Sequence, residues 1–193
     1  MKIFKLLLKN SLRHKLRTFL TILGIAIAVI AFNVLRTVVT AWSVGIEASS
    51  ANRLITRQAI SFIFTLPYAY RDKIAQVQGV EEVTFANWFQ GVYIDKNQFF
   101  ARLAVDPETL FRVYPEYLIS NDELATFKKE RNSCVIGIDI AKRYDLKIGD
   151  VMNIDGDIYP GNWDFVVKGI YHPRDKTTDA TQMFFHWTYL DER

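Results

Sequence analysis

The stretch TFLTILGIAIAVIAFNVL, residues 18–35, contains no charged side chain. As an α-helix these eighteen residues extend roughly 27 Å, close to the thickness of the hydrocarbon core of a bilayer. Eleven of them are Leu, Ile, Val or Phe. Their favourable transfer into lipid outweighs the cost of Arg36, whose long side chain can reach the interface. The apolar run resumes as far as Trp42, an aromatic typical of membrane interfaces, so the sequence predicts a transmembrane helix over residues 18–42.

Two other structures can produce an apolar run near an N-terminus. A buried helix of a soluble protein is one, but such helices rarely extend this far without a charge. A cleavable signal peptide is the other, and its apolar region usually spans about 7–15 residues before a small-residue cleavage site. The run here is longer, and the basic stretch before it is long for a signal peptide, so an uncleaved anchor is favoured.

The basic residues are concentrated before this run. Residues 1–17 hold six of the 24 Lys and Arg residues and no acid. Most of the six share one side of a helix, which predicts a cytoplasmic basic amphipathic helix over 1–17 lying on the anionic leaflet; a basic topogenic tail is the alternative. By the positive-inside rule this end is cytoplasmic and residues 43–193 lie outside, which in a bacterium with two membranes means that the helix crosses the inner membrane and these residues lie in the periplasm.

Three residues inside the run suit contact with other helices. Gly24 and Ala28 form a small-xxx-small pair, which lets helices approach closely in lipid. Asn33 is polar at membrane depth, where it would seek a partner. A single-span anchor needs neither feature, whereas a bundle of helices uses both.

The rest of the chain is mildly acidic. Removing the six basic residues of 1–17 leaves 18 Lys and Arg against 21 Asp and Glu. This balance argues against nucleic acid as a partner.

Beyond the apolar run, strand and helix signals alternate. This alternation, without long parallel-type apolar runs, predicts a membrane-anchored α+β protein: one transmembrane helix and then a mixed α/β domain. The Ser120-Asn121-Asp122-Glu123 sequence is a capping box that starts a helix. The expected helices are a helical stalk over 43–57, one from Pro67 to Gly79, one after Asp106-Pro107 and one after Ser120. The expected strands before residue 110 are 80–89 and a hairpin of 91–94 with 98–105. A compact unit follows, made of strand 134–138, helix 139–144, a Gly149-Asp150 turn and strand 151–154, and after it come a turn at 155–157 and strands 163–171 and 183–189.

A search for reactive residues predicts no catalytic, cofactor-binding or metal-binding residue. His14, His172 and His186 lack a second ligand at zinc spacing, and neither GxxxxGK[ST] nor GxGxxG occurs. Cys134 is expected to be a buried apolar residue rather than a reactive thiol.

Two weaker patterns also have ordinary explanations. Asp155-Gly156-Asp157 is better explained as a turn than as a calcium site, because the other EF-hand positions are missing. The aromatics Trp88, Phe89, Tyr93, Phe99 and Phe100 are expected to pack in the core rather than to line an apolar substrate groove.

Several motifs in order resemble the MacB-type permeases of the FtsX-like superfamily of ABC transporters. The motifs are LKNSLRHKLRT (8–18) followed by FLTILGI (19–25), GVEEV (79–83), VIG (135–137) with AKRY (141–144) and GDV (149–151), and WF (88–89), FFA (99–101), AVDP (104–107) and YPEY (114–117). Gln90 stands where the family pattern has Gly, a departure that affects only a turn.

The resemblance implies a permease of four transmembrane helices, with a large periplasmic domain between the first two. On this basis the chain ends inside that domain, and residues 43–193 are an incomplete MacB-like periplasmic core domain. Expected partners are the lipid bilayer, a separate ABC ATP-binding subunit, a second permease in a homodimer or heterodimer, and a periplasmic adaptor. The expected function is to pass ATP-driven motion to the periplasmic domain for export or extraction of substrate, without an enzyme activity or cofactor of its own.

Two alternatives remain from the residues. One is a single-span anchored periplasmic sensor or binding module without transport activity. The other is a membrane-anchored periplasmic enzyme, against which the lack of a nucleophile–base or metal constellation speaks more firmly.

Overall fold

The computed structural model describes residues 12–47, 52–61 and 64–193, and divides into two units between Arg53 and Leu54. Most of the amphipathic helix expected over 1–17 lies outside the described residues. Of its last part, Leu12–His14 form a short 3-10 helix, η1, that leads into the long helix α2.

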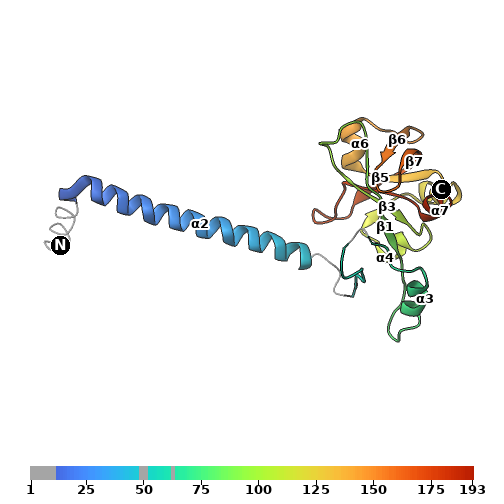
Figure 1. Ribbon diagram of the computed structural model, residues 1–193, viewed down its shortest axis with the longest axis horizontal. Coiled ribbons are helices and arrows are strands. Elements are labelled where there is room, and N and C mark those ends of the chain that lie inside the picture. The colour runs from blue at the N-terminus through green and yellow to red at the C-terminus, as the bar shows by residue number, and fades with distance from the viewer. Residues whose placement is uncertain (1–11, 48–51, 62–63) are drawn as a thin grey trace. The chain divides into compact units, whose positions relative to one another are not determined.

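The helix α2, Lys15–Glu47, is one unbroken helix of 33 residues (Figure 1). No proline interrupts it, and Gly24 is its first glycine. Within it, Lys15–Thr40 is long and apolar enough to cross a membrane. The helical stalk expected over 43–57 is wrong for residues 52–57, which form no helix, while residues 48–51 lie outside the described residues. Ile55 and Thr56 are β-branched and favour an extended backbone there.

The second unit is built on an eight-stranded mixed sheet. Its strand order is β1-β3-β8-β5-β7-β6-β2, with β4 beside β7. The β3–β8 and β5–β7 pairs are parallel and the other pairs are antiparallel. The strands are β1 Ala86–Trp88, β2 Gly91–Val92, β3 Ala101–Val105, β4 Tyr117–Leu118, β5 Ser133–Gly137, β6 Val151–Gly156, β7 Gly161–Pro173 and β8 Gln182–His186.

Helices cover both faces of this sheet, so it has two cores. In β5, Cys134 and Ile136 face one core and Val135 faces the other, as the alternation of a strand requires. The first core includes residues of α6 (Ile138–Tyr144) and α7 (Trp187–Asp191), and the second includes residues of α4 (Leu110–Val113) and α5 (Asn121–Lys129). The helix α6 lies beside the strands β5 and β7 (Figure 1). The predicted fold class, an apolar N-terminal helix followed by a mixed α/β domain, is confirmed.

A β-bulge in β7 determines which of the two cores the side chains in each half of the strand face. Opposite β5, Val167 pairs with Cys134 but Val135 pairs with Gly169, so Lys168 is the extra residue. The added residue reverses the in-and-out alternation. Val167 therefore belongs to the first core, and Tyr171, an even number of residues later, belongs to the second.

The expected hairpin of 91–94 with 98–105 is wrong. The strand β3 pairs instead with β1 and β8, and β2 pairs with β6. A Cβ atom at Gly91 would lie 2.7 Å from the backbone oxygen of Asp155, so glycine permits this close pairing with β6.

Two expected strands are longer than the observed ones. The strand expected over 80–89 is limited to β1, because its first pair is Ala86 with Val105, after which the partner chain turns away at Asp106. The strand expected over 183–189 ends at His186, the last residue paired with β3, and α7 follows directly. A strand continues only as far as its neighbours do.

The predictions that depended on neighbouring residues, namely helix starts and turns, were confirmed to within a few residues. Ser120 and Glu123 form the predicted capping box at the start of α5. The strand–helix–turn–strand unit appears as β5, α6, the turn at Gly149 and β6, with Gly149 at φ +101°. The helix α3, Ala69–Ala75, begins two residues after Pro67 and ends before Gly79. At Asp106 the carboxylate accepts from the backbone N–H of Glu108 at 3.0 Å, but α4 starts only at Leu110.

Candidate functional site

The polar side chains inside α2 bond to the helix's own backbone. Thr21 donates to the carbonyl of Arg17 at 2.9 Å, Asn33 to Val29 at 2.7 Å and Thr37 to Asn33 at 2.8 Å. These bonds lower the cost of placing hydroxyl and amide groups in lipid. The sequence suggested Asn33 as a partner-seeking residue, and the structure shows that one of its donors is already used.

The small residues of α2 leave a shallow, open strip on the helix. Apart from its chain neighbours and the nearby backbone of the helix itself, no atom lies within 4 Å of the position a Cβ would take at Gly24, and Ala28 is exposed. The large apolar side chains around them are exposed too, with Ile25 61% and Phe32 63% accessible. In water this surface would be costly, whereas in lipid it is the expected one.

The histidines and the cysteine of the second unit are separate from one another. Cys134 is fully buried in the first core, and burial raises the pKa of its thiol, as expected for an inert residue. His186 is buried beside Phe127 and its ring bonds to the carbonyl of Phe127. Burial lowers the pKa of His186, although that bond acts in the opposite direction. His172 lies on β7 opposite Leu118.

The acidic turn does not assemble a metal site. The turn expected at 155–157 is wrong for its first two residues, because Asp155 and Gly156 lie within β6 and the turn covers residues 157–160. The carboxylate of Asp157 accepts from the side-chain amide of Gln90 at 2.9 Å. Across the described residues, 12–47, 52–61 and 64–193, no group of three or more His, Cys, Asp or Glu is placed to hold a metal ion.

The aromatic residues singled out from the sequence separate into two sets. Phe89, Tyr93 and Phe100 are buried in the first core, where Phe89 packs against Trp163 and Phe185. Trp88 and Phe99 instead stack on each other, with ring centroids 5.8 Å apart, and Phe99 is 58% exposed. The core interpretation therefore holds for three of the five.

A residue that the sequence search did not single out is the buried Arg102. Its guanidinium lies 3.8 Å from the ring centroid of Phe100 and donates to the carbonyls of Gly91 at 3.0 Å and Phe100 at 3.2 Å. Its side chain is 1% accessible and burial lowers its pKa to about 10. The available signal was a cation at an inward-facing strand position, between Phe100 and Ala104.

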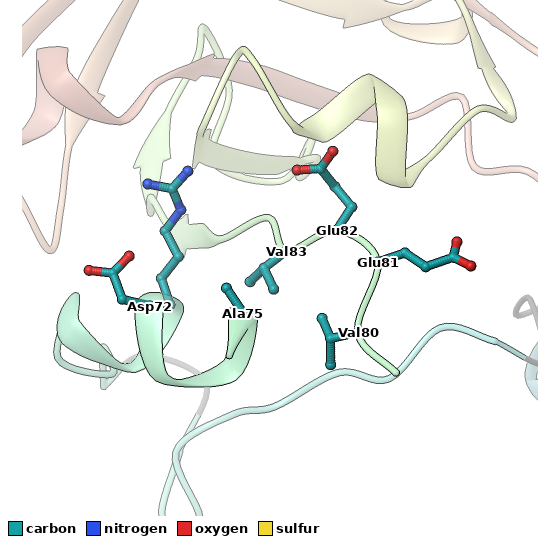
Figure 2. Close-up of a pocket in the computed structure, with 7 residues that line it drawn as sticks. Asp72, Ala75, Val80, Glu81, Glu82 and Val83 are labelled. Carbon is teal, nitrogen blue, oxygen red and sulfur yellow. The ribbon is translucent and has the colours of Figure 1, made fainter. Parts of the chain in front are cut away.

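A shallow groove of about 220 Å³ separates α3 from residues 80–83 (Figure 2). Val83 points towards Ala75, while the Glu81 side chain points away from the helix. Two of its charged side chains pair with residues outside the groove: Arg71 with Asp106 at 3.3 Å, and Glu82 with Arg112 at 3.2 Å. The carboxylates of Asp72 and Glu81 also line the groove, but no hydroxyl, thiol or imidazole group is among its lining side chains.

Comparison with solved structures finds distant relatives. The periplasmic region of MacB from Actinobacillus actinomycetemcomitans aligns at 10% identity with a TM-score of 0.47, over 67% of this chain and 58% of that one. A domain of a putative permease protein from Porphyromonas gingivalis aligns at 11% identity with a TM-score of 0.39, over 55% of this chain and 45% of that one. The chain thus spans less than two thirds of either structure. No curated protein matches it.

The family comparison is more extensive. The model of the MacB-like periplasmic core domain matches residues 18–193, which include the apolar part of α2 and the whole sheet domain. The apolar helix and this match are together consistent with a membrane-anchored protein. The chain therefore belongs to the MacB-like periplasmic core domain family of ABC transporter permeases.

Proposed function

We propose that this chain is the N-terminal part of a permease subunit of a MacB-type ABC transporter. Residues 1–17 lie on the cytoplasmic surface, 18–42 cross the inner membrane, and 43–193 form a periplasmic core domain. The basic residues before the span support this orientation through the positive-inside rule.

The observation that carries the proposal is one family match that includes both the apolar helix and the folded domain. A soluble module would match over the folded domain alone. At 33 residues, α2 is a rod of about 50 Å. Such a helix can pass a movement from one side of a membrane to the other, because a packed helix moves as a rigid body.

In this function the chain contributes no catalytic group. ATP is hydrolysed by a separate ATP-binding subunit, and the resulting motion reaches the periplasmic domain, which displaces substrate or an adaptor. A second permease completes the transporter. The exposed small-residue strip of α2 is suited to contact with other membrane helices.

Anchoring and orientation are tested first. Membranes carrying the chain are washed in alkaline carbonate, and intact spheroplasts are treated with proteinase. We expect retention in the membrane and digestion of residues 43–193. Replacing Ile25 and Ile27 by Asp should release the chain, since each Asp at a helix centre costs roughly 3 kcal/mol. The control is Val151→Asp, an exposed position of β6.

The transporter assignment is tested with the full-length gene product. A tagged permease is purified from membranes, and we expect a P-loop ATPase to purify with it and its ATP hydrolysis to depend on the permease. Retention in the membrane with no associated ATPase would overturn the assignment and favour the anchored sensor.

A further inference from the structure

The polar residues in the second half of the apolar part of α2 lie on one side of the helix. At 100° per residue, the four polar residues of 32–40 fall within an arc of about 100°, and the five apolar ones fall outside it. All nine are exposed in the structure. The arc is called the polar face below, and its residues are Asn33, Arg36, Thr37 and Thr40.

Arg36 lies at the far end of the uncharged run from Arg17. It follows Arg17 by nineteen residues, a rise of about 28 Å, so the two arginines stand at opposite boundaries of a hydrocarbon core about 30 Å thick. The positive-inside rule accounts for the basic residues before the run but not for an arginine at its other end. An ionisable residue of a crossing helix marks a contact with a partner of opposite charge. The ion pairs of the described residues do not include Arg36.

Another copy of α2 does not supply that partner. Glu47 is the first acid of the sequence and follows Arg36 by eleven residues, about 16 Å along the helix, so in a parallel copy it stands at a different depth. Two polar faces placed together also bring two copies of Arg36 close to each other. The small-residue strip at Gly24 and Ala28 is centred about 150° from the polar face. Contact with other helices along that strip therefore leaves the polar face towards lipid.

The order of groups along the polar face matches the order of groups in a phospholipid. Arg36 stands at the level of the phosphates, and its planar guanidinium can donate two parallel hydrogen bonds to a phosphate. Asn33 lies about one turn deeper, at the level of the ester carbonyls. One N–H of its amide donates to the carbonyl of Val29 at 2.7 Å, and an amide has a second N–H. Deeper still, the same side of the helix is apolar and suits acyl chains, with Ile22, Ala26 and Val29.

We propose that the polar face of α2 binds a phospholipid whose headgroup carries a net negative charge, with the phosphate at Arg36 and the acyl chains along Val29. A negative headgroup is favoured over phosphatidylcholine, because the choline cation repels the guanidinium. In the orientation of the proposed function this lipid belongs to the periplasmic leaflet. The inference rests on the membrane anchoring in the proposed function, and it concerns α2 alone.

The test detects acyl chains on two sides of α2 at similar depth. Val29→Cys places a fluorophore below the polar face, and Ala31→Cys places it about 200° round the helix as the matched control; both positions are exposed. The native Cys134 is fully buried and does not compete for label. The full chain is placed in phosphatidylcholine vesicles at neutral pH. A small fraction of the lipid is phosphatidylglycerol or phosphatidylcholine that carries a nitroxide quencher on its acyl chain.

The measured quantity is the selectivity ratio. It is the quenching by phosphatidylglycerol relative to phosphatidylcholine at position 29, divided by the same quotient at position 31. The division removes the attraction that the basic residues of 1–17 exert on every side of the helix. We expect a selectivity ratio of about five, the effect of one arginine on an anionic lipid. A ratio of one would overturn the proposal. If both lipids quench at 31 and neither quenches at 29, a protein surface covers the polar face, and the proposal fails as well.

Two variants test whether Arg36 causes the selectivity. Arg36→Gln should bring the selectivity ratio to about one. Arg36→Val combined with Val38→Arg keeps the net charge but moves the cation about 200° round the helix, to the side of position 31. This double variant should bring the ratio below one. A ratio that stays near five in either variant would contradict a role for Arg36 on the polar face.

Carbonate extraction of the same vesicles separates this inference from the proposed function. A chain that is retained with a selectivity ratio of one leaves the anchor intact and removes only the lipid site. A chain that is extracted removes the anchor, and the lipid site falls with it.

Discussion

The guanidinium of Arg102 donates a hydrogen bond to the carbonyl oxygen of Gly91, 3.0 Å away, and so connects β3 to the start of β2. These two strands are not neighbours in the sheet. The side chain also donates to Phe100, and it is buried where the described residues give its Nε atom no partner. A buried cation of this kind holds the 91–100 segment against the first core.

Replacing Arg102 by Met should destabilise the protein by about 2 kcal/mol, because the carbonyls of Gly91 and Phe100 lose a donor inside the protein. Denaturant unfolding of the detergent-solubilised chain, followed by near-UV circular dichroism, measures this change. Arg143→Met, at an exposed position of α6, should change the free energy of unfolding by less than about 0.5 kcal/mol. A variant as stable as the parent would mean that relief of the buried charge offsets the lost bonds.

Gly137→Ala should be strongly destabilising for a steric reason. Its φ of −71° suits alanine, but a Cβ there would fall 1.9 Å from the backbone oxygen of Ala180. The β7–β8 loop would have to move, although Tyr171 holds it by donating to the carbonyl of Asp179 at 2.8 Å. We expect a loss of about 3 kcal/mol in thermal or denaturant unfolding.

Gly149→Ala is the contrasting glycine variant. No atom lies within 4 Å of its Cβ position, and its φ is +101°. Only backbone strain then opposes alanine, and we expect a cost of about 1–2 kcal/mol. If the two glycine variants are equally stable, the contact of Gly137 with Ala180 is looser than the structure shows.

The buried His186 predicts a pH dependence of stability. Because burial lowers its pKa in the folded state, the unfolded chain binds a proton more readily. The free energy of unfolding should therefore fall as pH decreases through about 6.5, the ordinary histidine value, and level off below the folded pKa. Unfolding midpoints measured between pH 5 and 8 test this.

Two substitutions test whether His186 causes this pH dependence of stability. His186→Phe should flatten the profile between pH 5 and 7, while lowering stability because the carbonyl of Phe127 loses one of its two partners and keeps only the hydroxyl of Ser133, 3.0 Å away. His172→Gln, at an exposed position of β7, should leave the slope in place. A slope that survives in the His186 variant would assign the dependence to other groups.

The small-residue strip of α2 predicts an effect on assembly. In the full-length permease, Ala28→Leu should weaken association with other membrane helices by about tenfold, because a larger side chain separates closely packed backbones. Ala26→Leu makes the same change about 200° round the helix and should have little effect. Co-purification of two differently tagged copies measures this, and equal losses for both variants would contradict a role for this strip.

The sequence alone was informative wherever a structure depends on neighbouring residues. The apolar length of residues 18–35 predicted α2, because crossing a membrane requires only enough consecutive apolar side chains. The Ser120–Glu123 capping box and the Gly149 turn were likewise correct, since their bonds and dihedral angles involve residues three or four apart. The absence of a candidate catalytic residue remains a prediction.

Strand pairing was decided by tertiary structure. The pairing of β2 with β6 joins residues more than sixty positions apart, and the extents of β1 and β8 follow from where their neighbours end. The bulge at Lys168, which sends Val167 and Tyr171 into different cores, leaves no mark in the local pattern. Arg102 is similar, because the alternation with Phe100 and Ala104 indicates which face of the strand it shares, but only the structure shows the segment that covers that face. Hydrogen bonds between strands depend on the partner's position, which a single stretch of sequence does not encode.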